Sequence, residues 1–276
     1  MKTKKLKRAE VVELGHYEFM AYIGVPYFRW GGMESTDRLV KLCEIDTGKR
    51  VLIAGCGTGY SARYIAQKVG CEVVGLDISE MLIALAQEKA ETMGLQDQVK
   101  FVVGDAHDIP YEDNSFDVLL TESVVLFMDK ERALNEFARV IVPGGYVGLS
   151  EAFVTEDVST ETKKNLEEAE RLLSENVGLP VTIPTQSEWR NYFYMSGLQD
   201  VLMEEVDLTL KAGQWTEVVG RTGVAKVSLK ALYHMMLSKR IRERLSRDNQ
   251  LQNILLGKDT PRNSFGVILC IGRKGA

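Results

Sequence analysis

Cysteine and histidine are scarce in this sequence, and neither is spaced as a metal site requires. The chain of 276 residues has four cysteines and three histidines. No two cysteines show C-x-x-C spacing, which argues against a zinc site and against a disulfide framework. His16, His107 and His234 are far apart in the sequence, as is typical of surface histidines or of histidines satisfied within a core. We therefore predict no bound metal.

Long apolar runs are missing as well. No stretch approaches the roughly 18 apolar residues of a membrane span. Residues 1–8 are basic, but the apolar segment of a secretory signal peptide does not follow them, so we expect a cytoplasmic protein. The net charge of −5 gives no general attraction to nucleic acid. With 45% hydrophobic and 26% charged residues, the composition is that of a globular protein with a full core.

A glycine-rich loop is the most informative feature. The apolar residues 51–54 run directly into Gly55, Gly57 and Gly59, and a helical pattern begins at Tyr60. Such a run is typical of a buried parallel strand. Glycines after it let the backbone approach a ligand, toward which the next helix directs its free N–H groups. A dinucleotide fingerprint would need a glycine at the sixth loop position, where this chain has Tyr60.

Acids follow the next two predicted strands. Residues 71–77 form the second strand and end at Asp77, which is placed to accept both hydroxyls of a ribose. Residues 99–103 form the third strand, and Asp105 just beyond it could accept from an adenine amino group. Together with the glycine loop, these acids predict a nucleoside-binding edge.

These segments resemble the class I S-adenosylmethionine-dependent methyltransferases of the small-molecule type. The resemblance rests on Val-Leu-x-x-Gly-Cys-Gly-Thr-Gly from Val51, Gly-Leu-Asp-Ile-Ser from Gly75, Gly-Asp-Ala from Gly104 and Pro-Gly-Gly from Pro143. It implies S-adenosylmethionine as the cofactor. It also implies an α/β fold, a Rossmann-like, doubly wound and mostly parallel seven-stranded sheet with an antiparallel last strand and a helical N-terminal lid. One departure is Ile53, where the family usually has an acid that helps to order the loop.

The resemblance also implies which residues bind the cofactor. The backbone of the glycine loop would meet the methionine and ribose parts, and Asp77 would meet the ribose diol, with Ile78 against the adenine face. Asp105 and Ala106 would meet the adenine edge, and Glu122 would lie near the methionine end. The full set expected is Gly55, Cys56, Gly57, Gly59, Asp77, Ile78, Asp105, Ala106 and Glu122.

The remaining pattern predicts one domain in three parts. Residues 1–45 would form the lid, residues 46–155 the cofactor-binding core, and residues 156–276 the rest of the sheet with inserted cap helices. A short helix is expected to begin after an N-cap at Ser35 or Thr36. The other helices are expected at residues 9–23, 60–69, 80–94, 130–139, 156–176, 185–197 and 216–256. The later strands are expected at 116–121, 146–150, 201–210 and 264–271.

Apolar residues on both sides of the predicted site suggest the kind of acceptor. The arm before the first strand contains Tyr22, Tyr27, Phe28 and Trp30, and residues 124–128 after the fourth strand are apolar. These side chains either pack the arm onto the body or contact the substrate. If they line the pocket, they favour a small organic acceptor with an apolar or aromatic part over a hydrated zwitterion.

The arm also resembles the entry segment of phosphoethanolamine-type methyltransferases. Those relatives pair an arm tyrosine with a histidine after the fourth strand, but residues 124–128 contain no histidine, so we expect another substrate and proton relay. A base is needed only if the nucleophile arrives protonated. The candidate bases are His16, Tyr17, Tyr27 and Glu151. The residues that we predict to act in catalysis are Tyr17, Tyr27 and Glu122.

Several alternatives stay open. A nicotinamide-dependent oxidoreductase would use the same strand–loop–helix unit, although Tyr60 argues against it. Ile53 gives some support to a non-catalytic methyltransferase-like subunit. A basic amphipathic row between residues 221 and 247 suggests action on a lipid or nucleic acid, although such a row is more often a solvated helix face. The sequence leaves open whether the protein is a monomer or a homodimer, and which acceptor atom is methylated.

Overall fold

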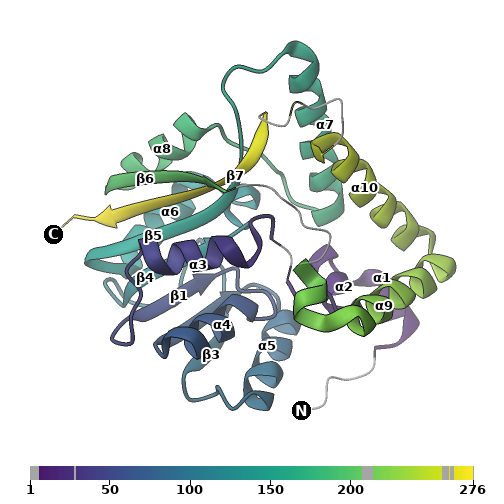
Figure 1. Ribbon diagram of the computed structural model, residues 1–276, viewed down its shortest axis with the longest axis horizontal. Coiled ribbons are helices and arrows are strands. Elements are labelled where there is room, and N and C mark those ends of the chain that lie inside the picture. Colours follow the sequence, from purple (N-terminus) through teal and green to yellow (C-terminus); the bar gives the residue numbers. More distant parts are fainter. Residues whose placement is uncertain (1–5, 28, 207–213, 257–260, 262–263, 276) are drawn as a thin grey trace.

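The computed structural model shows a mixed β-sheet with helices on both faces and a further group of helices beside it (Figure 1). The structure describes residues 6–27, 29–206, 214–256, 261 and 264–275. Among these residues, no helix is both long and apolar enough to cross a membrane. Strand β7 (Phe265–Lys274), the last element of the chain, ends at the side of the sheet away from this group of helices.

The sheet contains seven strands in the order β3-β2-β1-β4-β5-β7-β6. Strands β1 to β5 pair in parallel, whereas β7 is antiparallel to both β5 and β6. The strands are β1 Arg50–Ala54, β2 Glu72–Asp77, β3 Val99–Val103, β4 Phe116–Glu122, β5 Ile141–Val154, β6 Leu198–Val206 and β7 Phe265–Lys274. The predicted fold class is therefore confirmed. The strand order reverses between β1 and β4, and open α/β sheets bind their ligands at the carboxyl ends of such strands.

Local capping explains where several helices begin. The Ser79 hydroxyl accepts from the N–H of Leu82 at 3.2 Å at the start of α5 (Glu80–Thr92). The Asp129 carboxylate accepts from the N–H of Arg132 at 3.0 Å at the start of α6 (Lys130–Val140). The helices are α1 Arg8–Glu13, α2 His16–Ile23, α3 Gly32–Leu42, α4 Tyr60–Val69, α5 Glu80–Thr92, the short 3-10 helix η1 Val125–Phe127, α6 Lys130–Val140, α7 Thr160–Val177, α8 Gln186–Met195, α9 Gln214–Leu237 and α10 Lys239–Leu256.

Two apolar layers sandwich the sheet. Helices α3, α4 and α5 cover one face, where side chains such as Ile65 and Ile83 are buried against the strands. Helices α6 and α8 cover the other face with Phe137 and Trp189. The indole N–H of Trp189 donates to the carbonyl of Ala152 at 2.9 Å, so this large buried ring leaves no polar atom unsatisfied. Burial on both faces explains why the strands are continuous apolar runs.

The remaining helices form a separate core to the right of the sheet in Figure 1. There α1 and α2 of the arm pack against α9 and α10 through buried side chains that include Phe19, Ile23 and Ile241. Helix α9 breaks at Gly220, whose φ of 69° and ψ of 169° are not helical, so its continuous part begins just after this residue. Helix α7 packs against α10 and joins this group to the body.

The predicted start of the third helix was wrong. Helix α3 begins at Gly32, so Ser35 and Thr36 lie inside it and are fully buried instead of capping its end. The predicted helix at residues 9–23 is two helices, because Gly15 interrupts it and acts as the N-cap of α2. The N–H of Gly15 donates to the carboxylate of Glu18 at 3.0 Å, which fixes this second start.

Strand lengths were also underestimated in the second half of the chain. Strand β5 extends to Val154 because its far end pairs with β7, down to the contact of Val154 with Phe265. Strand β6 begins at Leu198 instead of residue 201, and the predicted residues 207–210 lie outside the described part of the chain. Helix α7 begins at Thr160, after the N-cap Ser159, and not at residue 156.

Candidate active site

The loop between β1 and α4 brings bare backbone to the reversal point of the sheet. Gly55, Gly57 and Gly59 all have positive φ, of 68°, 54° and 70°. A Cβ atom on Gly55 would lie 2.5 Å from the side chain of Val124, and one on Gly59 would overlap the ring of Phe101. The Cβ position of Gly57 has nothing within 4 Å. The loop is thus tightly packed on both flanks and open at its centre.

Asp77, at the end of β2, holds this loop in place. One carboxylate oxygen accepts from the N–H of Gly57 at 2.7 Å, and the other accepts from the N–H of Ser79 at 3.0 Å. Burial raises the pKa of Asp77 above its ordinary value, although these backbone donors act in the opposite direction. The neighbouring Ile78 is 73% exposed, which is unusual for so large an apolar side chain. The backbone N–H of Cys56 donates to the carbonyl of Leu76, so this N–H already has a hydrogen-bond partner within the protein.

Asp105 is oriented by a histidine. The backbone N–H and the ring Nδ1 of His107 both lie within 2.9 Å of one Asp105 oxygen. The N–H of Asp129 donates to Nε2 of the same ring at 3.1 Å, so Nδ1 carries the proton and donates it to Asp105. Partial burial would raise the pKa of Asp105, but the hydrogen bonds from His107 outweigh it and lower the pKa. Ala106 packs against the sheet beside them.

Glu122, at the end of β4, is enclosed by three side chains from other elements. Its Oε2 accepts from the guanidinium of Arg29 at 3.1 Å and from the hydroxyl of Ser61, and its Oε1 accepts from the hydroxyl of Thr36 at 2.6 Å. The exposed fractions of the Arg29 and Glu122 side chains are only 5% and 7%. The arm, α3, α4 and β4 are thereby joined at one buried ion pair.

The Tyr27 ring packs over the same region, tilted by 54° relative to the ring of Tyr60. Its ring centroid lies 5.1 Å from that of Tyr60 at the start of α4. The guanidinium carbon of Arg29 lies 4.7 Å from the Tyr27 centroid and 5.8 Å from that of Tyr60, so a cation–π contact adds to the ion pair. The arm therefore covers the glycine loop through aromatic rings and one cation.

Comparison with known proteins agrees with this geometry. Residues 52–149 match the family model described as a methyltransferase domain. A 27-O-demethylrifamycin SV methyltransferase from Amycolatopsis mediterranei is 30% identical over 188 residues, which make up 67% of this chain and 66% of that protein. A methyltransferase from Streptomyces halstedii is 34% identical over 133 residues, which make up 47% of this chain and 48% of that protein.

The fold has well-matched solved relatives. Phosphoethanolamine N-methyltransferase 2 from Haemonchus contortus, in complex with phosphomonomethylethanolamine and S-adenosylhomocysteine, superposes with a TM-score of 0.69. The superposition covers 98% of this chain and 61% of that one, at 19% identity.

The chain belongs to the class I S-adenosylmethionine-dependent methyltransferases. This confirms the predicted family, whose methyl donor is S-adenosylmethionine. The methyltransferase spans at most two thirds of the length of each of the three proteins named above.

The candidate bases of the methyltransferase differ in their surroundings. Burial and the nearby carboxylates of Glu151 and Asp248 raise the pKa of the Tyr17 phenol well above its usual range. Burial, together with two arginines of α10, lowers the pKa of His16 to about 4. Burial raises the pKa of Glu151 to about 7, although backbone donors pull it down. Glu151 accepts from the N–H groups of Val124 and the next residue at 2.8 and 2.9 Å.

Aromatic rings from distant parts of the chain meet beside η1. The Tyr17 ring lies 5.9 Å from Phe127, and the Trp30 ring lies 4.7 Å from Phe265 at the start of β7. The N–H of Trp30 donates to the hydroxyl of Ser123 at 3.4 Å. Of the predicted apolar residues of the arm, the structure brings Trp30 to the segment after β4, whereas Tyr22 packs against His234 in the helical group and Phe28 lies outside the described residues.

Sequence reasoning missed Arg29 and Ser61, which hold Glu122. The one available signal was that Arg29 is a lone cation within an aromatic cluster of the arm.

The described residues contain no group of three or more His, Cys, Asp or Glu side chains arranged to hold a metal ion.

Proposed function

We propose that this methyltransferase moves the methyl group of S-adenosylmethionine to a small organic acceptor with an apolar or aromatic part. The observation that carries the proposal is a set of aromatic rings next to the loop after β4: Tyr17 contacts Phe127, Trp30 contacts Phe265, and Trp30, Phe127 and Phe265 belong to one apolar cluster. A pocket bordered by such rings stabilises apolar surface at about 25 cal/mol per Å² buried. A small, fully hydrated zwitterion would lose more in desolvation than it gained.

The residues at the carboxyl edge of the sheet suit the cofactor. The open backbone at Gly57 admits a ligand, and Asp77 retains acceptor capacity because a carboxylate has roughly four lone-pair positions. We assign the exposed Ile78 to the adenine face. The remaining cofactor contacts are assigned to Gly55, Cys56, Gly59, Asp105 and Ala106. When bound, the cofactor supplies a methyl group already activated on a sulfonium, so the protein's main task is alignment and no metal is needed.

The arm is assigned the role of a lid. Residues 1–45 carry Arg29 and Tyr27, whose contacts with Glu122 and Tyr60 cover the glycine loop. A closed lid excludes water and strengthens electrostatic interactions inside the site. Glu122 already accepts three hydrogen bonds, so we now assign it to anchoring the lid instead of proton transfer.

Glu151 is the best-suited base where the acceptor arrives protonated. A base works best when its pKa lies near the operating pH, and the pKa of Glu151 is about 7. Its Oε2 is buried and has no hydrogen-bond partner within the described part of the chain. The phenol of Tyr17, with its strongly raised pKa, does not ionise near neutral pH. We therefore assign proton acceptance to Glu151 and substrate positioning to Tyr17 and Tyr27.

The names of two kinds of relative point to different acceptors. The Amycolatopsis relative is named for 27-O-demethylrifamycin SV, whereas others are named phosphoethanolamine N-methyltransferases. The aromatic surroundings of the site favour an acceptor nearer to the first kind. We further propose a single domain, present as a monomer or homodimer. The cytoplasmic location stays a prediction.

The test is a methyl-transfer screen with labelled cofactor across phenols, quinols, hydroxylated macrocycles, heteroaromatic amines, thiols and short zwitterions. We expect best turnover on an apolar acceptor, with Phe127→Ala raising KM more than it lowers kcat. With a hydroxyl acceptor, the rate should rise with pH around the pKa of Glu151, about 7, and Glu151→Gln should remove that rise. Best turnover on ethanolamine derivatives or glycine would overturn the acceptor proposal.

A further inference from the structure

Helix α9 exposes a continuous apolar stripe. Leu229, Leu232, Tyr233 and Met236 are 66%, 53%, 60% and 73% exposed. Their spacing of three, four and seven residues places them on one face of a helix. Single exposed apolar residues are common on protein surfaces, but a contiguous row marks a surface that contacts something else.

The fold does not need this stripe for its own packing. The opposite face of α9 carries Val227, Ala231 and Met235, which pack against the buried side chains of α2. That inner face fixes how α9 sits on the arm and turns the other face outward. Helix α9 thus has two apolar faces. The inner one packs against the rest of the protein, and the outer one is exposed.

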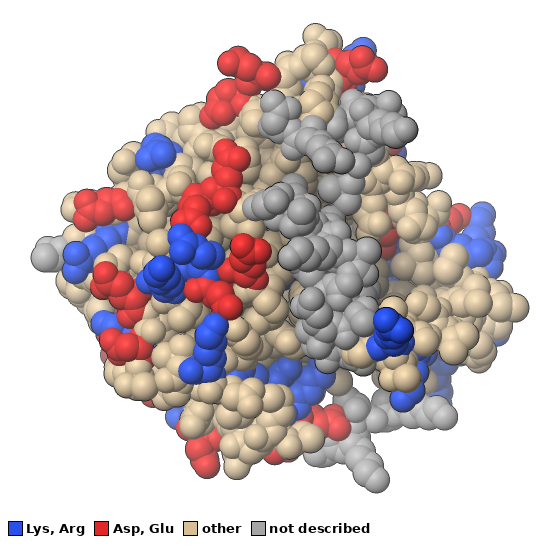
Figure 2. All heavy atoms as spheres, in the orientation of Figure 1, with Lys and Arg blue, Asp and Glu red and all other residues tan. Residues whose placement is uncertain are grey.

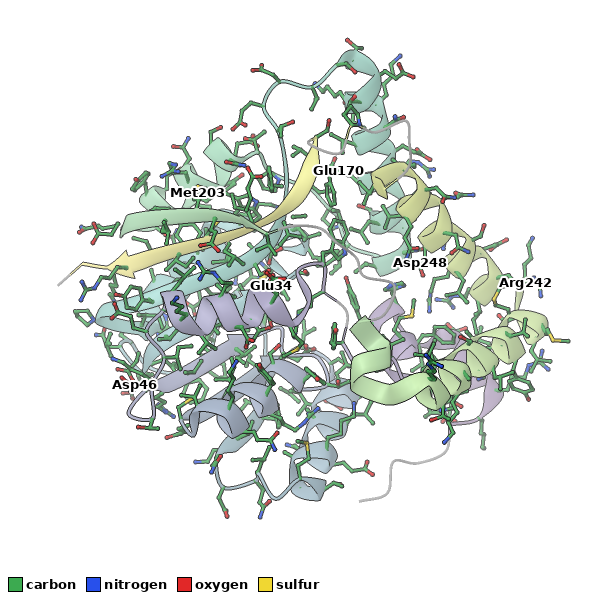
Figure 3. The ribbon with its side chains drawn as sticks, viewed as in Figure 1. Glu34, Asp46, Glu170, Met203, Arg242 and Asp248 are labelled. Carbon is green, nitrogen blue, oxygen red and sulfur yellow. The ribbon has the colours of Figure 1, made fainter. Side chains whose placement is uncertain are left out.

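Basic side chains border the stripe. Between residues 220 and 256 there are eight Lys and Arg against two Asp and Glu, in a chain whose net charge is −5. The exposed ones include Lys226, Lys230, Lys239 and Arg242. Arg242 lies at the outer edge of this helical group (Figure 3). In Figure 2, blue groups and tan surface prevail at the right, where the helical group lies, whereas red groups are more frequent over the sheet at the left.

Arg8, the first residue of α1, lies beside the end of the same helix. The guanidinium of Arg8 donates to the carbonyl of Leu237, the last residue of α9. The seven residues before Arg8 include four lysines, namely Lys2, Lys4, Lys5 and Lys7. Arg8 therefore adds a positive charge at the end of the stripe.

We propose that α9 and its basic border bind the surface of an anionic lipid bilayer. Amphipathic helices with bulky apolar residues on one face and Lys and Arg at its edges lie in the interfacial plane of membranes, and their binding depends on anionic lipids. Nucleic acid fits less well, because a phosphate backbone offers nothing to bury four large apolar side chains. This inference does not depend on the identity of the methyl acceptor.

Vesicle sedimentation tests the proposal with the full-length protein. Phosphatidylcholine vesicles with and without phosphatidylglycerol are compared at low and high salt. We expect binding to the anionic vesicles to be roughly tenfold or more stronger, and to weaken as salt screens the charges. Leu232→Gln with Met236→Gln should reduce that binding by about tenfold or more, while glutamine preserves helix propensity.

A matched control separates the stripe from general hydrophobicity. Met195 on α8 is 62% exposed, so Met195→Gln removes a similar exposed side chain elsewhere and should bind as the wild type does. Lys226→Glu should weaken binding to anionic vesicles only. Thermal melts check that each variant is folded.

Several results would overturn the proposal. Equal binding to neutral and anionic vesicles would show that the basic side chains do not contribute to membrane binding. Binding of the double variant at the wild-type level would show that the apolar stripe does not contribute. Stripe-dependent dimers without vesicle binding would make α9 a self-association face. Tight RNA binding with no vesicle binding would make the border a nucleic-acid surface.

Discussion

The buried ion pair between Arg29 and Glu122 allows a quantitative test of how the arm is held. Replacing Arg29 by Met leaves the Glu122 carboxylate buried, at 7% exposed, without its counter-charge. Breaking a buried pair in this way typically costs about 3–5 kcal/mol. Glu122 keeps the hydroxyls of Thr36 and Ser61, and hydrogen bonds to charged groups are each worth about 1.5–3 kcal/mol. We therefore expect a cost at the lower end of the range.

The assay must separate global unfolding from release of the arm. Arg29 belongs to the arm and Glu122 to β4, so the variant can relieve its unpaired charge by letting the arm open. Urea denaturation measures the free energy of unfolding without screening charges, as guanidinium chloride would. Amide exchange in α2 and α3 measures arm opening. A cost near 3 kcal/mol corresponds to an increase of about a hundredfold in the open population.

Two further variants serve as controls. Arg38 forms a bidentate pair with Glu204, but their side chains are 35% and 34% exposed and screened by solvent, so Arg38→Met should cost far less than Arg29→Met. Adding Glu122→Gln to Arg29→Met removes the uncompensated charge and should restore about 1–2 kcal/mol. The reasoning is refuted if Arg29→Met costs no more than Arg38→Met, or if the added glutamine restores nothing.

Three further predictions follow from the site and its surroundings. Gly59→Ala puts a methyl group into the ring of Phe101 at a φ of 70°, and should lower stability by about 2–4 kcal/mol in urea melts; wild-type stability would contradict this close packing. Asp77→Ala should weaken S-adenosylmethionine by about 1.5–3 kcal/mol in calorimetry, because a charged acceptor is lost; unchanged affinity would remove Asp77 from the cofactor site. Burial raises the pKa of Asp248 to about 6, so the folded state binds this proton more tightly and the contribution of Asp248 to wild-type stability should fall as pH rises from 3.8 to about 6. Asp248→Asn removes that loss, so its stability relative to wild type should rise by up to about 2–3 kcal/mol over the same range; a constant difference in urea titrations would show that Asp248 titrates normally.

Much of the sheet and its helices could be predicted because local signals agree. The predicted helix at residues 60–69 and strand at residues 99–103 coincide with α4 and β3. A buried parallel strand is a continuous apolar run, and a helix after a glycine loop keeps one apolar face, so neither prediction needs distant contacts. The N-cap Ser79 was also predictable, because its hydroxyl accepts from the N–H of Leu82, only three residues further along the chain.

Boundaries failed where a distant contact overrides the local signal. Ser35 and Thr36 have the side chains of N-caps, yet both are buried inside α3. Thr36 donates its hydroxyl to Glu122, a residue on β4, so a partner far along the chain decides its role. Strand β5 likewise runs past its predicted end because β7, more than a hundred residues later, pairs with it.

The sequence by itself determined the family, the cofactor and the edge of the sheet where the site lies, since glycines, acids and strand ends are read from short segments. Only the tertiary structure decided that Arg29 pairs with Glu122, that Asp248 lies near Tyr17, and that α9 turns an apolar stripe outward. The physical reason is that burial and ion pairing depend on contacts between residues that are far apart in the sequence. Those contacts form only when the chain folds, so the residue spacing within one segment cannot predict them.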